Sequence, residues 1–256
     1  IKEDICNYDN LKKIFHKFSP DLILHLAAQA GVRYSRKNPY SCLNSNLYGF
    51  MNVLDLAKDI NKKLIYASSS SVYGHSNEVP LREDFNSLNP GSIYGTSKKI
   101  NEELSAKYCD EFDMNIIGLR FFTVYGSYGR PDMAYYMFTK SIQENKEISI
   151  FNKGKVSRDM THVEDICSGI TAAINLDSSG HHLYNLGNEE PISVMKLVDK
   201  IEKFLNKKAK IKYIDDQREV LITHACLEKS RNELSYAPKV SFENGMNEFL
   251  EWYSKY

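Results

Sequence analysis

Tyr94 and Lys98 have the residue types and the spacing of an acid–base pair on a helix. Residues four positions apart lie on the same face of an α-helix, so the phenol and the ammonium would be neighbours. The positive charge would stabilise a phenolate and lower the phenol pKa from its usual value of about 10. Such a pair can accept and return a proton near neutral pH, although the same spacing also occurs on ordinary solvated helix faces.

A run of hydroxyl side chains precedes this helix, in the segment Ala67-Ser-Ser-Ser-Ser-Val-Tyr-Gly74. The run follows an apolar stretch that predicts a strand, and α/β proteins bind ligands at the carboxyl ends of parallel strands. Four consecutive serines could equally form a polar loop. Their place just before Tyr94 and Lys98 favours a part in the same site.

The elements that must position these residues alternate between short apolar runs and longer amphipathic ones. Near-continuous apolar runs are typical of strands in a parallel sheet that helices cover on both faces. Strands are expected at 21–27, 63–68 and 115–122, and helices at 7–18, 39–60 and 91–112. The predicted fold class is therefore α/β, with a doubly wound parallel sheet.

The pattern changes after Gly126, where a turn-rich segment is followed by shorter elements. Helices are expected near 133–143, 193–205 and 242–253, and strands near Ile148, Leu183 and Ile211. Residues 1–126 are thus predicted to form the main sheet domain. Residues 127–256 are predicted to form a smaller mixed α/β lobe that binds substrate, with some segments returning to the main sheet.

The composition is that of a globular protein without a strongly charged partner. Its 256 residues include 33 basic and 33 acidic side chains, and 42% are apolar. The zero formal charge offers no field that would attract nucleic acid, and no stretch has the ~20 apolar residues of a membrane helix. The five cysteines are widely spaced and show no metal-ligand pattern. This predicts free thiols, no metal site and a cytoplasmic location.

Seven motifs follow one another in order along nearly the whole chain. They are His25-Leu-Ala-Ala-Gln-Ala-Gly-Val-Arg33, Asn46-x-x-Gly-x-x-Asn52, Ala67-Ser-Ser-Ser-Ser-Val-Tyr-Gly74, Tyr94-x-x-x-Lys98, Leu119-Arg-Phe-Phe-Thr-Val-Tyr-Gly126, Gly129-Arg-Pro-Asp-Met133 and Arg158-Asp-Met-Thr-His-Val-x-x-Asp165. Together they resemble the extended short-chain dehydrogenase/reductase family of nucleotide-sugar epimerases, most closely the UDP-glucuronate 4-epimerases. The resemblance implies a Rossmann-like fold, NAD as cofactor and a UDP-sugar as substrate.

The resemblance also implies residue roles. Tyr94 would be the acid–base group, Lys98 its electrostatic partner and Ser69 a hydrogen-bonding third member. The cofactor would be bound by Asp4, Ile5, Leu26, Ala27, Ala28, Asn46, Ala67, Tyr94, Lys98 and Phe121. The substrate would be bound by Arg33, Ser69, Ser70, Ser71, Thr123, Arg130 and Arg158. Pairing of such proteins through the helices near 39–60 and 91–112 implies a homodimer.

The expected reaction is epimerisation at C4 of UDP-glucuronate, to UDP-galacturonate, through a transient 4-keto sugar. Dehydratases of the family have Asp-Glu where this chain has Ser70-Ser71, and hydroxyls of ordinary pKa cannot take the proton that elimination requires. Ser70, Ser71, Thr123 and Arg130 could hold the substrate carboxylate. A surface polysaccharide pathway would use the product. Two alternatives stay open: an epimerase of neutral UDP-hexoses, and a catalytically silent nucleotide-sensing module.

Two departures from the family pattern concern the chain start and the C-terminal segment. The family opens with a glycine-rich turn that holds the cofactor pyrophosphate, and none precedes Asp4. With no initial Met, the sequence is expected to be truncated by at least one βαβ unit and to bind NAD poorly. Farther on, Gln217-Arg218-Glu219 stands where relatives have Pro-Gly-Asp, so Glu219 could replace the acid and Arg218 would add a cation.

Overall fold

The computed structural model describes residues 1–76, 78–85, 88–216 and 219–256, and Gln217 and Arg218 therefore lie outside the described residues. The chain divides into two compact units. The first contains 1–77, 83–121 and 170–185, and the second contains 78–82, 122–169 and 186–256. Each unit has its own sheet and its own core.

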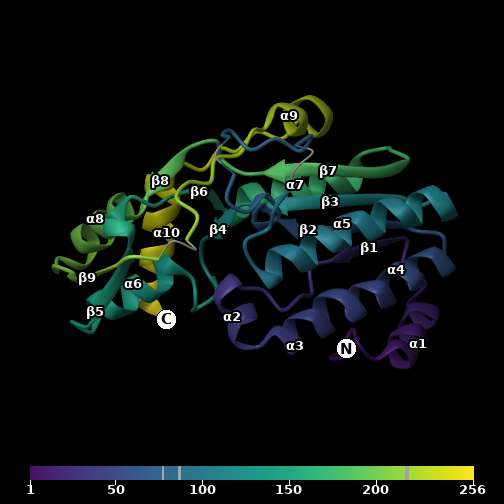
Figure 1. Ribbon diagram of the computed structural model, residues 1–256, viewed down its shortest axis with the longest axis horizontal. Coiled ribbons are helices and arrows are strands. Elements are labelled where there is room, and N and C mark those ends of the chain that lie inside the picture. Colours follow the sequence, from purple (N-terminus) through teal and green to yellow (C-terminus); the bar gives the residue numbers. More distant parts are fainter. Residues whose placement is uncertain (77, 86–87, 217–218) are drawn as a thin grey trace. The chain divides into compact units, whose positions relative to one another are not determined.

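The first unit is built on a sheet with the strand order β1-β2-β3-β7. Its strands are β1 (Leu22–His25), β2 (Lys63–Ser69), β3 (Asn115–Phe121) and β7 (Gly180–Leu186, whose last residue belongs to the second unit). The first three strands run parallel to one another, side by side in Figure 1. The predicted Rossmann-like α/β fold is thereby confirmed.

The helices of the first unit follow the predicted ranges with two differences. They are α1 (Tyr8–Phe18), α2 (Val32–Lys37), α3 (Pro39–Leu43), α4 (Phe50–Asp59) and α5 (Ile93–Phe112). The helix expected at 39–60 contains a π-helical turn over Asn44–Gly49, between α3 and α4. Helix α2 was not predicted.

Packing of α1, α4 and α5 against the sheet forms the core of the first unit. Phe50, Leu54 and Ala57 of α4 are almost fully buried with Leu64 of β2 and Ile116 of β3. Removing these apolar side chains from water is the main force that holds α4 against the strands. In Figure 1, α4 and α5 lie next to each other along this sheet.

Helix α7 (Val163–Asn175) is shared, since its first part belongs to the second unit and Ile170–Asn175 to the first. Lys63, the first residue of β2, donates hydrogen bonds from Nζ to the carbonyl oxygens of Ala173 and Leu176, at 2.7 and 2.6 Å. A cation is favoured here because the carbonyl groups at a helix C-terminus are unpaired and carry partial negative charge.

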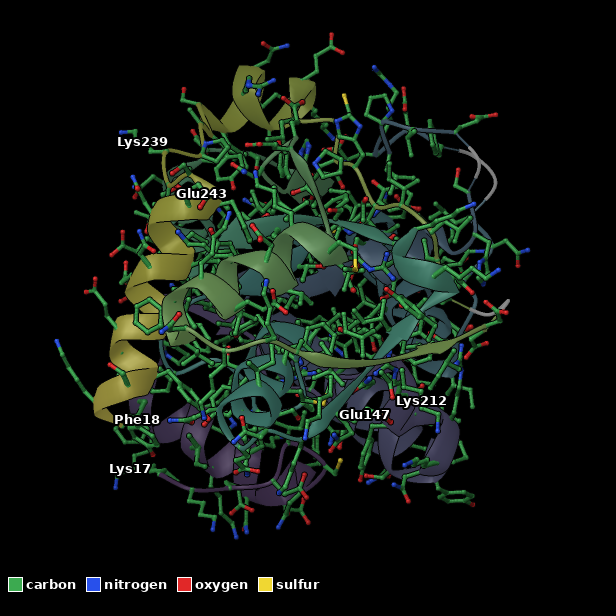
Figure 2. The ribbon with its side chains drawn as sticks, turned by 90° about the vertical axis from the view of Figure 1, so that its left-hand side faces the viewer. Lys17, Phe18, Glu147, Lys212, Lys239 and Glu243 are labelled. Carbon is green, nitrogen blue, oxygen red and sulfur yellow. The ribbon has the colours of Figure 1, made fainter. Side chains whose placement is uncertain are left out.

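The described residues of the second unit form two small sheets and four further α-helices. A three-stranded sheet has the order β4 (Thr123–Tyr125), β6 (Ser157–His162) and β8 (Pro191–Ser193), and β5 (Glu147–Phe151) pairs in parallel with β9 (Lys210–Ile214). Figure 2 shows Glu147 and Lys212 on neighbouring strands of the smaller sheet. The helices are α6 (Ala134–Gln143), α8 (Val194–Leu205), α9 (Glu228–Leu234) and α10 (Phe242–Lys255).

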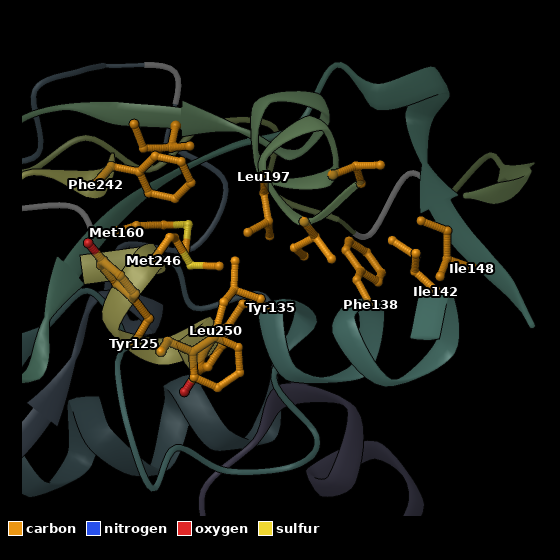
Figure 3. Close-up of a cluster of buried hydrophobic side chains, with 14 of the residues drawn as sticks. Tyr125, Tyr135, Phe138, Ile142, Ile148, Met160, Leu197, Phe242, Met246 and Leu250 are labelled. Carbon is orange, nitrogen blue, oxygen red and sulfur yellow. The ribbon is translucent and has the colours of Figure 1, made fainter. Parts of the chain in front are cut away.

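An aromatic-rich core fills the second unit (Figure 3). Tyr135 and Phe138 of α6 pack with Leu197 of α8 and with Met246 and Leu250 of α10. Of these, Met246 and Leu250 have no exposed surface. The core therefore holds the three helices together on one side of the strands that carry Thr123 and Arg158.

Candidate functional site

Tyr94 lies at the N-terminus of α5. Both its backbone N–H and its backbone carbonyl oxygen are hydrogen-bonded to serine side chains. Ser92 caps the helix, accepting a hydrogen bond from the N–H of Gly95 at 3.0 Å. The N–H of Tyr94 donates to Oγ of Ser35 at 3.2 Å, and its carbonyl oxygen accepts from Oγ of Ser97 at 2.8 Å. Tyr94 is therefore half-buried in the first turn of α5, where the hydroxyls of Ser35 and Ser97 hold its backbone in place.

Lys98 lies one turn farther along α5 and is 3% exposed. Its Nζ donates a hydrogen bond to the carbonyl oxygen of Ala67 in β2 at 2.7 Å. Burial lowers the pKa of the Lys98 amine to about 8, and the nearby Cys42 and Glu102 oppose this shift. The ammonium is therefore directed to the carboxyl end of β2, beside the serine run.

The serine run forms a tight turn at the end of β2. Oγ of buried Ser69 accepts a hydrogen bond from the N–H of Ser71 at 3.1 Å and so caps the 3₁₀ turn over Ser70–Tyr73. A Cβ on Gly95 would come 2.5 Å from the carbonyl oxygen of Ser71. Only a glycine at position 95 allows α5 to approach the turn this closely. The structure thus brings Ser69, Tyr94 and Lys98 to one region of the first unit.

Asn46, in the π-helical turn, connects two other parts of this region. Its Oδ1 accepts from the N–H of Gln29 at 2.8 Å, and its Nδ2 donates to the carbonyl oxygen of Gln29 at 3.1 Å and to Oγ of Ser97 at 3.0 Å. The amide therefore ties the segment after β1 to α5. Its two donors and its acceptor are directed to protein groups, which is the geometry of a bracing residue.

The predicted cofactor-binding residues of the first unit gather at the carboxyl ends of its parallel strands. Leu26, Ala27 and Ala28 directly follow β1, Ala67 lies near the end of β2, and Phe121 ends β3. Leu26 is 48% exposed. An apolar ring system could cover it. This edge is where open α/β sheets bind ligands.

Asp4 and Ile5 lie before α1, and Ile5 is close to Gly49, where the π-helical segment continues directly into α4. Asp4 is exposed, and its Oδ1 accepts from the N–H of Cys6 at 2.9 Å. The carbonyl oxygen of Ile5 accepts from Nδ2 of Asn52 at 2.9 Å. The side chain of Ile5 fills the space beside Gly49. Arg33 is exposed on α2.

Three predicted substrate-binding residues belong to the second unit. Thr123 is half-buried at the start of β4. Exposed Arg130 donates to both carboxylate oxygens of Asp132 at 2.9 Å. Arg158 of β6 contacts Glu219, with Nη2 and Oε1 2.5 Å apart.

The sequence interpretation missed Ser35, Glu102 and Arg120. Glu102 continues the stripe of Tyr94 and Lys98 by one more helical turn, and Arg120 interrupts an otherwise apolar strand. Glu102 and Arg120 could have been noticed in the sequence, because a charge that is buried needs a partner. The sequence gives no such sign for Ser35, because the residue that it contacts lies 59 positions away.

The described residues contain neither a candidate metal-binding cluster nor a candidate membrane-spanning helix. His, Cys, Asp and Glu nowhere gather there in a group of three that could bind a metal ion. Among the same residues, every helix is too short or too polar to cross a bilayer.

Comparison with known proteins gives consistent matches. The model of the NAD dependent epimerase/dehydratase family matches residues 1–187. The uncharacterized protein MJ1055 of Methanocaldococcus jannaschii is 44% identical over 255 residues, covering 99% of this chain and 78% of that protein. UDP-glucuronate 4-epimerase 4 of Arabidopsis thaliana is 41% identical over 275 residues, covering 100% of this chain and 63% of its own length. The chain therefore spans less than two thirds of this plant relative.

Solved structures match as well. The UDP-glucuronic acid 4-epimerase of Bacillus cereus, crystallised with UDP-glucuronic acid and NAD, superposes with a TM-score of 0.93 at 33% identity. The match covers 100% of this chain and 81% of that one.

Proposed function

The chain belongs to the NAD dependent epimerase/dehydratase family, and we propose that it interconverts UDP-glucuronate and UDP-galacturonate by epimerisation at C4 of the sugar. One observation carries the proposal. Buried Lys98, one helical turn from Tyr94, donates to the carbonyl oxygen of Ala67 just before the serine run. Support for the substrate comes from the similarity to epimerases whose names specify UDP-glucuronate.

The residues at the carboxyl edge of β1 to β3 fit a dinucleotide. Exposed Leu26 and the small side chains of Ala27 and Ala28 leave room for a flat ring system at this edge. Asp4 and Ile5 would flank the adenine, while Ala67, Phe121 and Lys98 would line the nicotinamide half. When bound, NAD would accept the hydride from C4 and return it to the opposite face of the 4-keto sugar.

Proton transfer is the work of this chain's own residues. Tyr94 would take the proton of the C4 hydroxyl and return it after the keto sugar has turned over. Lys98 would stabilise the Tyr94 phenolate by its positive charge, and Ser69 would donate a hydrogen bond to the phenolate oxygen. A phenolate needs this charge because its ordinary pKa of about 10 leaves it protonated at neutral pH.

Substrate binding is proposed for residues of both units, in the roles predicted from the sequence. Arg158 would bind the diphosphate, and Arg130 with Thr123 would bind the sugar carboxylate by charge-assisted and neutral hydrogen bonds. Ser70, Ser71 and Arg33 would complete the sugar site. Residues 1–126 are proposed as the NAD-binding domain and 127–256 as mainly the nucleotide-sugar lobe.

We also propose a homodimer in the cytoplasm. Three large side chains of the α3–α4 helix, Tyr40, Tyr48 and Met51, are 90%, 68% and 43% exposed, and a second copy would cover them. All five cysteines lie in the described residues and have free thiols, which suits a reducing compartment. Light scattering of the purified protein would give twice the mass of one chain.

The substrate is tested by incubating the purified protein with NAD and either UDP-glucuronate or UDP-glucose. Proton NMR of the sugar distinguishes each C4 epimer from its starting material. Conversion of UDP-glucuronate alone supports the proposal. Conversion of UDP-glucose alone would instead identify an epimerase of neutral hexoses, and conversion of neither by protein that is shown to bind NAD would indicate the nucleotide-sensing alternative.

A further inference from the structure

A buried ion pair joins α5 to the centre of β3. Arg120 is 1% exposed. Its Nε and Nη2 donate to Oε1 and Oε2 of Glu102, at 2.9 and 2.8 Å. This is the two-pronged geometry in which a guanidinium and a carboxylate bind most strongly. Charges at this depth are costly unless paired, so the pair must be formed for α5 to pack in its observed position.

The same carboxylate also contacts β2, next to the group that Lys98 contacts. Oγ of Ser68 donates to Oε1 of Glu102 at 2.5 Å. Nζ of Lys98 donates to the carbonyl oxygen of Ala67, the preceding residue. Two side chains one turn apart on α5 are thus bonded to two consecutive residues of β2. This double attachment fixes both the rotation and the axial position of the helix.

Arg120 is in turn held from a third direction. Its Nη1 donates to Oη of Tyr73 at 2.9 Å, and Tyr73 Oη donates to Oδ1 of Asn185 in β7 at 2.7 Å. Tyr73 ends the 3₁₀ turn that the serine run begins. The network therefore links α5, the serine turn and the strands β2, β3 and β7.

We propose that Glu102, held by Arg120, is a positioning residue of the acid–base site, fixing α5 against β2 and keeping Lys98 protonated beside Tyr94. This inference rests on the proposed function of Tyr94 and Lys98. Glu102 touches no reacting atom in that mechanism and acts through Lys98.

The charges around Lys98 support this role. Burial lowers the pKa of the Lys98 amine to about 8, and the negative charge of Glu102 raises it in opposition. Without that carboxylate, Arg120 would be an unpaired cation behind Lys98, and Lys98 would lose its proton at lower pH. The titratable and charged groups on the surrounding elements are Tyr94 and Glu102 of α5, Cys42 of α3, His25 of β1, Tyr66 of β2, Tyr73 of the 3₁₀ turn and Arg120 of β3.

The first test is the pH dependence of turnover in the Glu102→Gln variant. The amide keeps the shape of the side chain and removes its charge. We expect the alkaline limb of the kcat profile to move to lower pH by about one unit, since Lys98 then deprotonates earlier. The control is Glu103→Gln, the same change at the next residue, whose side chain is 63% exposed and contacts Lys99. Its profile should match the wild type.

A double variant separates positioning from stability alone. Glu102→Gln leaves Arg120 buried without a negatively charged partner, so the variant should melt at a lower temperature than the wild type. Glu102→Gln/Arg120→Met removes both charges, and we expect its melting temperature to recover most of the decrease that Glu102→Gln causes. The alkaline limb of the kcat profile should still lie at lower pH than in the wild type, because the negative charge of Glu102 is still missing. A limb that returns together with the melting temperature would overturn the proposal and leave the pair a purely structural role.

A third measurement does not depend on turnover. In protein with ¹³C-labelled lysine, the Cε resonance of Lys98, assigned with Lys98→Arg, reports its protonation. We expect a midpoint near 8 in the wild type and a lower one in both Glu102 variants. An unchanged midpoint would overturn the proposal. A lowered midpoint in a protein that leaves UDP-glucuronate unchanged would support the proposal and contradict only the proposed reaction.

Discussion

The backbone N–H of Tyr94 donates a hydrogen bond to Oγ of Ser35, 3.2 Å away, although 59 residues separate them in the chain. The N–H groups in the first turn of a helix have no partner within the helix. Ser92 satisfies one of them in α5, and Ser35 satisfies another from α2. Ser35 also donates to the carbonyl oxygen of Val32 at 2.9 Å, which directs its lone pairs toward α5. A short helix thereby fixes the residue proposed to carry the proton.

The Ser35→Ala variant should be less stable and less active. It loses a cap-like hydrogen bond, which costs about 1 kcal/mol in the free energy of unfolding. Turnover should fall severalfold with little change in KM, because Tyr94 is held less firmly. Urea unfolding and steady-state kinetics measure the two effects. Ser254→Ala, which removes an exposed hydroxyl of α10, serves as the control and should change neither.

Replacing the proposed acid–base group should stop the chemistry and leave the fold intact. Tyr94→Phe removes one hydroxyl from a half-buried ring. We expect kcat for UDP-glucuronate to fall by at least about 100-fold, the usual contribution of a positioned acid–base group. Circular dichroism should be unchanged. Wild-type turnover in this variant would exclude Tyr94 from proton transfer.

The stability of the protein should fall in mild acid because of His25. Burial, with the nearby charge of Lys98, lowers the pKa of His25 to about 4. Between the ordinary pKa of about 6.5 and this value, the unfolded chain binds a proton that the folded protein does not. The stability contributed by neutral His25 is present above pH 6.5 and is lost as the pH falls toward 4. The loss should reach about 3 kcal/mol.

This pH dependence is measured by urea unfolding at pH 7, 6, 5 and 4. The His25→Asn variant should lose less stability over this range than the wild type. His16→Asn, a change at the exposed end of α1, should follow the wild type. Parallel curves for wild type and His25→Asn would contradict the prediction.

The close approach of α5 to the serine turn predicts that Gly95→Ala is harmful, even though alanine favours helices. The added Cβ would lie 2.5 Å from the carbonyl oxygen of Ser71, and backbone cannot move aside cheaply. We expect a loss of about 1–3 kcal/mol and a marked loss of turnover. Gly91→Ala is the control, since its Cβ would meet only the ring of exposed His75, which is free to move aside. An active, stable Gly95→Ala protein would disprove the tight contact.

Binding of the diphosphate is tested at Arg158. Charge-assisted hydrogen bonds contribute about 1.5–3 kcal/mol each. Arg158→Gln should therefore raise KM for UDP-glucuronate by about 10- to 100-fold, with a smaller change in kcat. Titration calorimetry with UDP alone should show the same weakening. Equal affinity of the variant and wild type for UDP would remove Arg158 from the site.

Much of the sheet could be predicted from the sequence because its signals are local. The apolar runs in β1, β2 and β3 are nearly continuous, and the ends of these strands in the structure lie within two residues of the expected ends. Helix α5 was predicted to within two residues at its start. Helix α7, whose residues are divided between the two units, was not predicted.

The residue types of the site were predictable, but its supporting contacts were not. Tyr94, Lys98 and Ser69 stand in short motifs whose spacing has chemical meaning. Ser35 and Arg120 act through partners distant in sequence, Tyr94 and Glu102, and no local pattern indicates which residues will meet. Their roles become visible only when the strands and α5 are assembled.

The π-helical turn over Asn44–Gly49 makes chain length in this region more critical than side-chain identity. A wide turn of this kind contains one residue more than an α-helical turn, and each residue advances a helix by about 100°. Deleting one residue of the π-helical turn would convert it into an ordinary α-helical turn and displace the Asn46 amide from Gln29. Deleting one residue elsewhere between Pro39 and Asp59 would rotate the helix on one side of the deletion relative to the other. Exposed positions outside the proposed dimer contact, such as Asp59, should accept many substitutions, whereas single insertions or deletions along this helix should be selected against in related sequences.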